Sequence, residues 1–204
     1  MYQVLSADKI KEYQQKHLKL KDEDINLKDL LIFYEENIIP YIYTYECEHE
    51  LKVRFSFEDE NLCHLLYGTV DKTFSNRKNY TGKQGYKCIK NETVTFEKLP
   101  EKLKKKCIHR IKSFLLIEKI LEKPKVIIYN KNMVDRKKLK ESLIQSKFLL
   151  YRELNTGSIV HLFVDERGGS KKLIPISFFP DNDENYISEQ IRFKVVNSEK
   201  IQKI

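Results

Sequence analysis

Apolar and polar residues alternate along several stretches of the chain, and this period of two predicts β-strands. In residues 51–57 every second position is apolar, and residues 41–47, rich in aromatic and β-branched side chains, precede them across a polar turn. These two stretches predict a β-hairpin. The alternation and short apolar runs predict further strands at 125–129, 148–154, 159–164, 172–179 and 191–196.

Elsewhere apolar residues recur every three or four positions, which predicts helices over residues 6–17, 24–38 and 99–121. The longest of these has one continuous apolar stripe, formed by Leu103, Cys107, Ile111, Phe114, Ile117 and Leu121. Residues 86–89 are interpreted as a short extended piece. Because the helices and strands are segregated along the chain, the predicted class is α+β. We expect an antiparallel sheet of about four strands with a long packed helix, in a domain over 40–204 that follows an N-terminal helical appendage over 1–39.

Residues 55–68 are the stretch around which the rest of the chain is organised, because a strand passes there into a short helix. Leu62, Leu65 and Leu66 share one face of this helix, and Gly68 is placed to end it. His64 lies roughly 200° around the helix from Leu62 and therefore points away from the leucines. An imidazole in that position can titrate and do chemistry. The alternative is a surface histidine without a chemical role.

Charge is unevenly distributed along this basic chain, whose formal net charge is +8. Residues 1–50 hold 6 Lys and Arg against 11 Asp and Glu, whereas residues 101–150 hold 15 against 5. A concentrated basic surface is typical of proteins that bind a phosphate backbone, although a lysine-rich solvated surface has the same composition. The four cysteines are irregularly spaced, and no apolar run is long enough for a membrane span. We therefore expect a cytoplasmic protein with reduced cysteines and no membrane partner.

No phosphate-binding glycine loop, His-Glu-x-x-His or Gly-x-Ser-x-Gly motif occurs, so we expect neither a cofactor nor a metal. Cofactor-free RNA cleavage needs only a base for the ribose 2′-OH, an acid for the 5′ oxygen and cations for the transition state. Polar residues beside predicted core elements supply these types. The catalytic candidates are His64, Arg110, Ser177 and Tyr186, and the nucleic-acid-binding candidates are Lys104, Lys105, Lys106, Lys171 and Lys172.

The pattern Phe-x-Phe-x6-His-Leu-Leu-x-Gly at residues 55–68 resembles the opening motif of a family of phage and mobile-element proteins. That family is the fourth phage class of the Barnase–EndoU–Colicin–RelE-like (BECR) nucleases. The similarity extends over residues 40–200, through the helix after Arg110, the strand pair 148–164 and the segment 177–190. The chain departs from the family pattern at Tyr67, which separates the leucines from Gly68. The resemblance implies an RNase-type fold, with helices packed on a four-stranded antiparallel sheet.

Two functions remain open at this point. The first is a metal-independent endoribonuclease, a toxin or a phage or mobile-element effector, acting on RNA such as tRNA. The second is a non-catalytic phage-derived protein of the same fold that binds nucleic acid or a host protein. A host defence protein and a cognate antitoxin are the corresponding protein partners. Arg110 could likewise bind phosphate or form a structural ion pair with Glu118 or Asp135.

Overall fold

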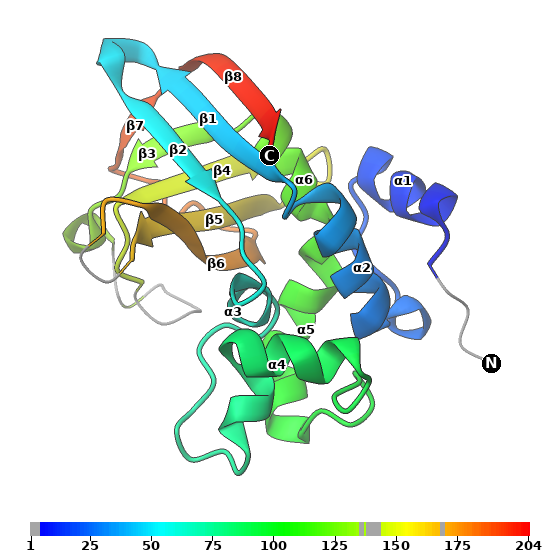
Figure 1. Cartoon of the computed structure of the whole chain (residues 1–204). Coiled ribbons are helices and arrows are strands. Elements are labelled where there is room, and N and C mark those ends of the chain that lie inside the picture. The colour runs from blue at the N-terminus through cyan, green and yellow to red at the C-terminus, as the bar shows by residue number, and fades with distance from the viewer. Residues whose placement is uncertain (1–4, 135–136, 138–143, 168–169) are drawn as a thin grey trace.

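The computed structural model describes residues 5–134, 137, 144–167 and 170–204 (Figure 1). It confirms the α+β class but shows one mixed sheet of eight strands, curled into a nearly closed barrel. The expected antiparallel sheet of about four strands is therefore wrong. The hairpin at 41–57 and the strand at 125–128 join the same sheet as the C-terminal strands, because all of them have apolar faces to bury in one interior.

The strands follow the spatial order β7-β3-β4-β5-β6-β2-β1-β8. Their bounds are β1 (Tyr41–Cys47), β2 (Lys52–Ser56), β3 (Lys125–Ile128), β4 (Phe148–Glu153), β5 (Ile159–Glu166), β6 (Leu173–Asp181), β7 (Ile191–Phe193) and β8 (Val195–Gln202). Neighbouring strands are antiparallel except β2 and β6, which run parallel and are paired only at Phe55 and Leu173. The sheet thus divides at this weak junction, and no strand from the described part of the chain lies beside most of that edge of β6.

The helices are α1 (Ala7–Gln15), α2 (Leu27–Asn37), α3 (Asn61–Tyr67), α4 (Gly82–Lys90), α5 (Glu101–Ser113) and α6 (Ile117–Glu122). Side chains cap the first two, since Ser6 accepts a hydrogen bond from Lys9 N at 3.2 Å and Asn26 accepts one from Lys28 N at 2.9 Å. The cap at Asn26 explains why α2 begins later than the predicted start at residue 24. A 3-10 turn, Phe114–Leu116, divides the predicted helix 99–121 into α5 and α6.

The apolar stripe of the predicted long helix is confirmed despite this break. Leu103, Cys107, Ile111, Phe114 and Ile117 are all fully buried. In Figure 1, α5 lies below the barrel and contacts β6, whereas α6 lies beside the barrel, near the C-terminus, and contacts β4 and β5. The extended piece predicted at 86–89 is wrong, because these residues belong to α4. Tyr86 and Ile89 are three positions apart, so they share one helical face that packs inward.

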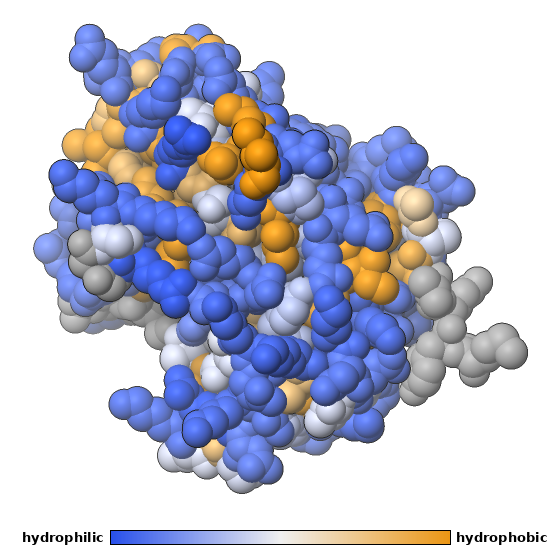
Figure 2. All heavy atoms as spheres, in the orientation of Figure 1, coloured by the Kyte–Doolittle hydropathy of each residue, from blue (hydrophilic) through white to orange (hydrophobic). Residues whose placement is uncertain are grey.

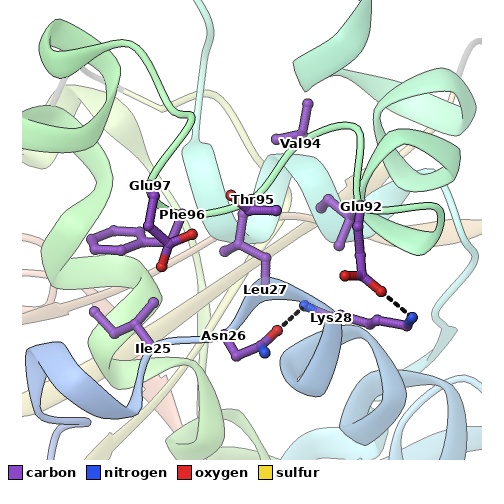
Figure 3. Close-up of a pocket in the computed structure, with 10 residues that line it drawn as sticks. Ile25, Asn26, Leu27, Lys28, Glu92, Val94, Thr95, Phe96 and Glu97 are labelled. Atoms are coloured by element: carbon purple, nitrogen blue, oxygen red, sulfur yellow. Dashed lines mark hydrogen bonds and ion pairs between the residues drawn. The ribbon is translucent and has the colours of Figure 1, made fainter. Parts of the chain in front are cut away.

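The N-terminal helices share the core that the sheet and α5 form. Tyr34 of α2 lies edge-on to Phe57, with ring centroids 6.0 Å apart, and Phe33 packs similarly on Phe114 at 6.3 Å. The predicted boundary between residues 39 and 40 crosses this shared core. A small pocket of about 60 Å³ separates the start of α2 from residues 92–97, and the ion pair between Lys28 and Glu92 borders it (Figure 3). That volume is enough for a few water molecules.

A second hydrophobic cluster covers the other face of the sheet and surrounds His161. Phe163, Phe179 and Tyr186 lie around this imidazole, with ring centroids 5.3 to 6.4 Å from it. His161 is fully buried, and neither ring nitrogen has a hydrogen-bond partner in the part of the chain that the structure describes. Burial lowers the pKa of His161 to about 3. The nearby Phe179 backbone acts to raise the pKa of His161, although its distance and angle to the ring nitrogens do not meet those of a hydrogen bond.

We therefore expect His161 to make the protein sensitive to acid. Below pH 6.5 the unfolded chain binds a proton at this residue and the folded chain does not, so stability falls as pH decreases toward the folded pKa. The loss between pH 7.5 and 5.0 should be roughly 2 kcal/mol from this residue. In His161→Leu that part of the loss should disappear in urea unfolding. The control Phe163→Leu keeps the imidazole and should keep the parent's pH dependence; an unchanged dependence in His161→Leu would contradict the assignment.

Candidate functional site

The candidate site lies where α3, α5 and β6 meet, below the barrel in Figure 1. Four residues separate the end of β2 from the start of helix α3, and Leu62, Leu65 and Leu66 are fully buried on the inner face of α3. His64 lies on the opposite face and is exposed, as its position around the helix from Leu62 predicts. The same burial that holds α3 therefore presents the imidazole to solvent.

Gly68 ends α3 with a φ of +64° and ψ of −148°, a conformation that is essentially restricted to glycine. Its missing side chain also leaves space for the guanidinium of Arg110. A Cβ atom at this position would lie 3.0 Å from Arg110 Cζ and 3.3 Å from Nε and Nη2. Gly68 thus allows both the end of α3 and the close approach of α5.

Arg110 joins α5 to β6. It is 4% exposed, and its Nη1 donates to Ser177 Oγ at 3.0 Å and to the Phe178 carbonyl at 2.8 Å. Its Cζ lies 5.0 Å from the centroid of the Phe179 ring, a cation–π geometry. β2 pairs with β6 only at Leu173, so the backbone carbonyls farther along that edge of β6 need hydrogen-bond donors from another element. Arg110 is the donor for the Phe178 carbonyl.

The surroundings of His64 favour the neutral form of its imidazole. The packed protein around the ring lowers the pKa of His64, and the positive charges of Arg77 and Arg110 lower it further, while Glu60 opposes them. A neutral, exposed imidazole can accept a proton. The site therefore has the protonation state that a general base requires.

The structure brings three of the four predicted catalytic residues together, and only His64 of these faces solvent. Arg110 and Ser177 are buried and bonded to each other. Tyr186 is fully buried beside Phe179, with ring centroids 5.2 Å apart, and it contacts the same Phe179 ring that the Arg110 guanidinium contacts. Of the alternative ion-pair partners of Arg110, Glu118 accepts a hydrogen bond from Gln14 at 2.7 Å. Asp135 lies outside the described residues.

The predicted nucleic-acid-binding lysines lie in two places, on α5 and just before β6, and three of the five already have a partner in the protein. Successive residues of a helix point about 100° apart, so Lys104, Lys105 and Lys106 face different directions. Lys104 pairs with Glu101 at 3.0 Å, and Lys106 donates to the Thr69 carbonyl at 2.7 Å, while Lys105 is exposed. Lys172 is held by Glu58 beside the end of β2, and Lys171 is exposed.

The basic charge gathers instead in one helical lobe, formed by residues 69–113 with α4, α5 and the loop before them. This lobe has 13 Lys and Arg against 4 Asp and Glu, whereas the whole chain has 38 against 30. The rest of the chain is therefore close to neutral. The lobe occupies the lower part of Figure 1, and hydrophilic residues cover most of its visible face in Figure 2. His64 lies at its border, since Arg77 and Arg110 of the lobe act on its pKa.

Sequence reasoning missed two parts of this site. Arg77 went unnoticed because the loop that carries it has no regular pattern, and only the fold brings it near His64. The basic lobe went unnoticed because windows of fifty residues divided it, although a count over residues 69–113 would have found it. The contact between Gly68 and Arg110 has no sequence signal at all.

Two other kinds of feature are absent from the ranges that the structure describes. No group of three or more His, Cys, Asp and Glu side chains there is placed to hold a metal ion. None of the helices in those ranges has the length and apolarity required to cross a membrane. The four cysteines are buried and free.

Comparison of the chain with protein-family models, curated proteins and solved structures finds no match. The resemblance to the BECR nucleases therefore stays a prediction, and the functional argument depends on the residues themselves.

Proposed function

We propose that this protein binds RNA through the basic lobe and cleaves it with His64 as the general base, without a metal ion. The observation that carries the proposal is the position of an exposed histidine, with a lowered pKa, at the border of the lobe that holds the net charge. An RNA backbone drawn to the lobe passes this imidazole. General-base catalysis by one positioned group contributes about 10²–10⁴ in rate.

In this scheme neutral His64 takes the proton of a ribose 2′-OH. The 2′ oxygen then forms a bond to phosphorus while the bond to the 5′ oxygen breaks, and the leaving oxygen takes a proton from solvent. The products carry 2′,3′-cyclic phosphate and 5′-hydroxyl ends. Nη1 of Arg110 is already bonded to Ser177 and Phe178, so Arg110 contributes by holding α3 against β6 and by its charge beside His64.

Incubation of the purified protein with total RNA in EDTA tests the activity. We expect fragments whose 3′ ends resist ligation until the cyclic phosphate is removed. Intact RNA after incubation at protein concentrations that saturate binding would remove the catalytic part of the proposal.

A specific observation favours the second candidate, a protein of this fold that binds nucleic acid or a host protein without cleaving RNA. Ser177 and Tyr186 are buried, and Arg110 is occupied by structural hydrogen bonds. Of the four predicted catalytic residues, His64 is therefore the one whose side chain can reach a substrate from solvent. Binding of RNA with no cleavage would support this candidate, and absence of both would leave a protein partner as the remaining form of it.

RNA affinity should depend steeply on salt and on the lobe. In Lys78→Glu/Lys83→Glu/Lys105→Glu, three exposed lysines of the lobe are reversed, and we expect at least a tenfold loss of affinity at 0.1 M salt. The slope of log affinity against log salt should decrease by about 2, since each contact to a single strand contributes about 0.7. Fluorescence anisotropy with a labelled RNA oligomer measures both quantities.

The control Lys11→Glu/Lys19→Glu/Lys194→Glu makes the same change of charge on exposed residues outside the lobe. Its affinity should stay within about threefold of the parent, because screening weakens distant charges beyond about 10 Å at this salt. Equal losses in the two variants would show that net charge, and not the lobe, attracts RNA.

A further inference from the structure

The barrel has a gap beside β8 that arises from the way the last two strands separate. Only Lys194 lies between β7 and β8, yet β7 pairs with β3 while β8 pairs with β1. The last pair on the β3 side joins Val126 and Phe193, so β8 diverges from β3 directly afterwards. Among the described residues, β8 is consequently an edge strand of the sheet, and no strand lies beside it on the side away from β1.

A groove of 670 Å³ occupies this gap. It is lined by residues 122–125 at the junction of α6 and β3, by Arg152 and Glu153 of β4, and by residues 194–198 of the β8 side. A smaller hollow of 130 Å³ follows β8 to Lys200, between the strand and α6. The two share Glu122 and Ser198 and form one path along the edge of β8.

The backbone of β8 presents hydrogen-bonding groups to this path. Lys203 N donates to the Pro40 carbonyl at 2.7 Å, on the side of β1. Hydrogen-bonded pairs alternate along an antiparallel ladder, so the N–H and C=O groups of Ser198 and Lys200 point the other way. Such an edge can accept another extended chain.

The charges of the groove define what it can accept. Its two carboxylates are already paired, Glu153 with Lys125 at 2.7 Å and Glu122 with Arg152 at 3.5 Å. Lys123 and Lys194 are exposed and have no ion-pair partner in the parts of the chain described above. Val195 and Val196 add apolar surface, and Val196 is 63% exposed. The groove thus combines unpaired backbone, apolar contacts and uncompensated positive charge.

We propose that the free edge of β8 is a docking surface for an extended, acidic segment of a partner protein, which adds a strand to the barrel. Its backbone pairs with Ser198 and Lys200, its apolar side chains contact the two valines, and its carboxylates meet Lys123 and Lys194. The surface lies at the top of the molecule in Figure 1, whereas α3 and the basic lobe lie at the bottom. The proposal is therefore independent of RNA binding and goes beyond the function proposed above.

The probe is a fluorescein-labelled, capped octapeptide of alternating valine and glutamate, titrated against the full chain by anisotropy. Two control peptides replace glutamate by lysine or carry N-methyl groups on alternate residues, which removes the pairing N–H groups. We expect saturable binding of the Val-Glu peptide and at least tenfold weaker binding of both controls. Hydrogen exchange should show new protection of the Ser198 and Lys200 amides when the peptide is bound.

Two variants of the protein locate the binding. Ser198→Pro removes an N–H that faces the groove, with Ser198→Ala as the matched control that keeps it. Lys123→Glu/Lys194→Glu reverses the free charges, with Lys78→Glu/Lys83→Glu as a control on the basic lobe. Each test variant should weaken binding at least tenfold, and each control should stay within threefold. The charge variant and the N-methylated peptide decide the matter if Ser198→Pro does not fold.

Absence of saturable binding up to 1 mM peptide, or equal binding of the Val-Glu and Val-Lys peptides, would overturn the proposal. Self-association that Ser198→Pro abolishes, measured by sedimentation equilibrium, would also overturn it, because the occupant of the edge would then be a second copy of this chain.

Discussion

His64→Ala should reduce RNA cleavage by about 10²–10⁴-fold while leaving RNA affinity and the folding stability close to those of the parent. The rate falls because the variant has no group to take the 2′-OH proton. Affinity persists because the lysines of the basic lobe remain. Stability persists because the exposed His64 contributes no apolar surface to the core, unlike Leu65 and Leu66. Single-turnover cleavage, anisotropy and thermal unfolding measure the three properties.

Chemical rescue separates a catalytic role of His64 from a structural one. Added imidazole should restore part of the rate of His64→Ala, and it should have no effect on the parent or on a variant that is merely misfolded. A rate for His64→Ala equal to that of the parent would assign the base to another group.

The pH profile gives an independent check of the same assignment. Because burial and the charges of Arg77 and Arg110 lower the pKa of His64, the acidic limb of the rate should lie below pH 6.5. Arg77→Ala removes one of these charges and should move the limb to higher pH, because the protonated imidazole is then no longer repelled by Arg77. A limb that stays in place would show that His64 is not the group that titrates.

Arg110→Met should lower the free energy of unfolding by roughly 3 kcal/mol, which is the largest stability effect we expect. The change leaves the Phe178 carbonyl and Ser177 Oγ without their donor inside the protein, and each such loss costs about 1–3 kcal/mol. Urea unfolding measures it. The matched control Lys106→Met, one turn earlier on α5, loses an exposed bond to Thr69 and should change stability by less than about 0.5 kcal/mol.

Gly68→Ala extends this test to the contact between α3 and α5. In the parent background the new methyl group meets the guanidinium at 3.0 Å and the backbone is strained by its positive φ. In the Arg110→Met background the steric part of this cost should decrease. The double variant should therefore lose less free energy of unfolding than the sum of the losses in the two single variants. Strict additivity, or a loss below about 1 kcal/mol in Arg110→Met, would show that Arg110 does not join α5 to β6.

Local periodicity predicted much of the secondary structure because it reports which face of each element is buried. The alternation in residues 51–57 identified β2, and the stripe through Cys107 and Ile111 identified α5. It failed at α4, where the short segment 86–89 fits a strand or a helix equally well. The segment is helical in the structure because this conformation places Tyr86 and Ile89 on one face, where both are buried.

The candidate site was predicted only in part, for the same reason. The helical position of His64 relative to Leu62 correctly placed the imidazole on the outer face. The role of Arg110 was not visible, because its acceptors, Ser177 and Phe178, belong to a strand far away along the chain. A polar residue at the margin of an apolar stripe can face solvent or reach an unpaired carbonyl, and periodicity does not distinguish the two.

The sequence by itself determined the α+β class, most strands, the faces of α3 and α5, and the excess of positive charge. Only the tertiary structure decided that the strands form one eight-stranded, nearly closed sheet and that the charge gathers in a single lobe. It alone brought Arg77 and Arg110 beside His64 and left the edge of β8 open. The physical reason is that periodicity records burial against something, whereas strand order and long-range contacts depend on which buried surfaces fit one another.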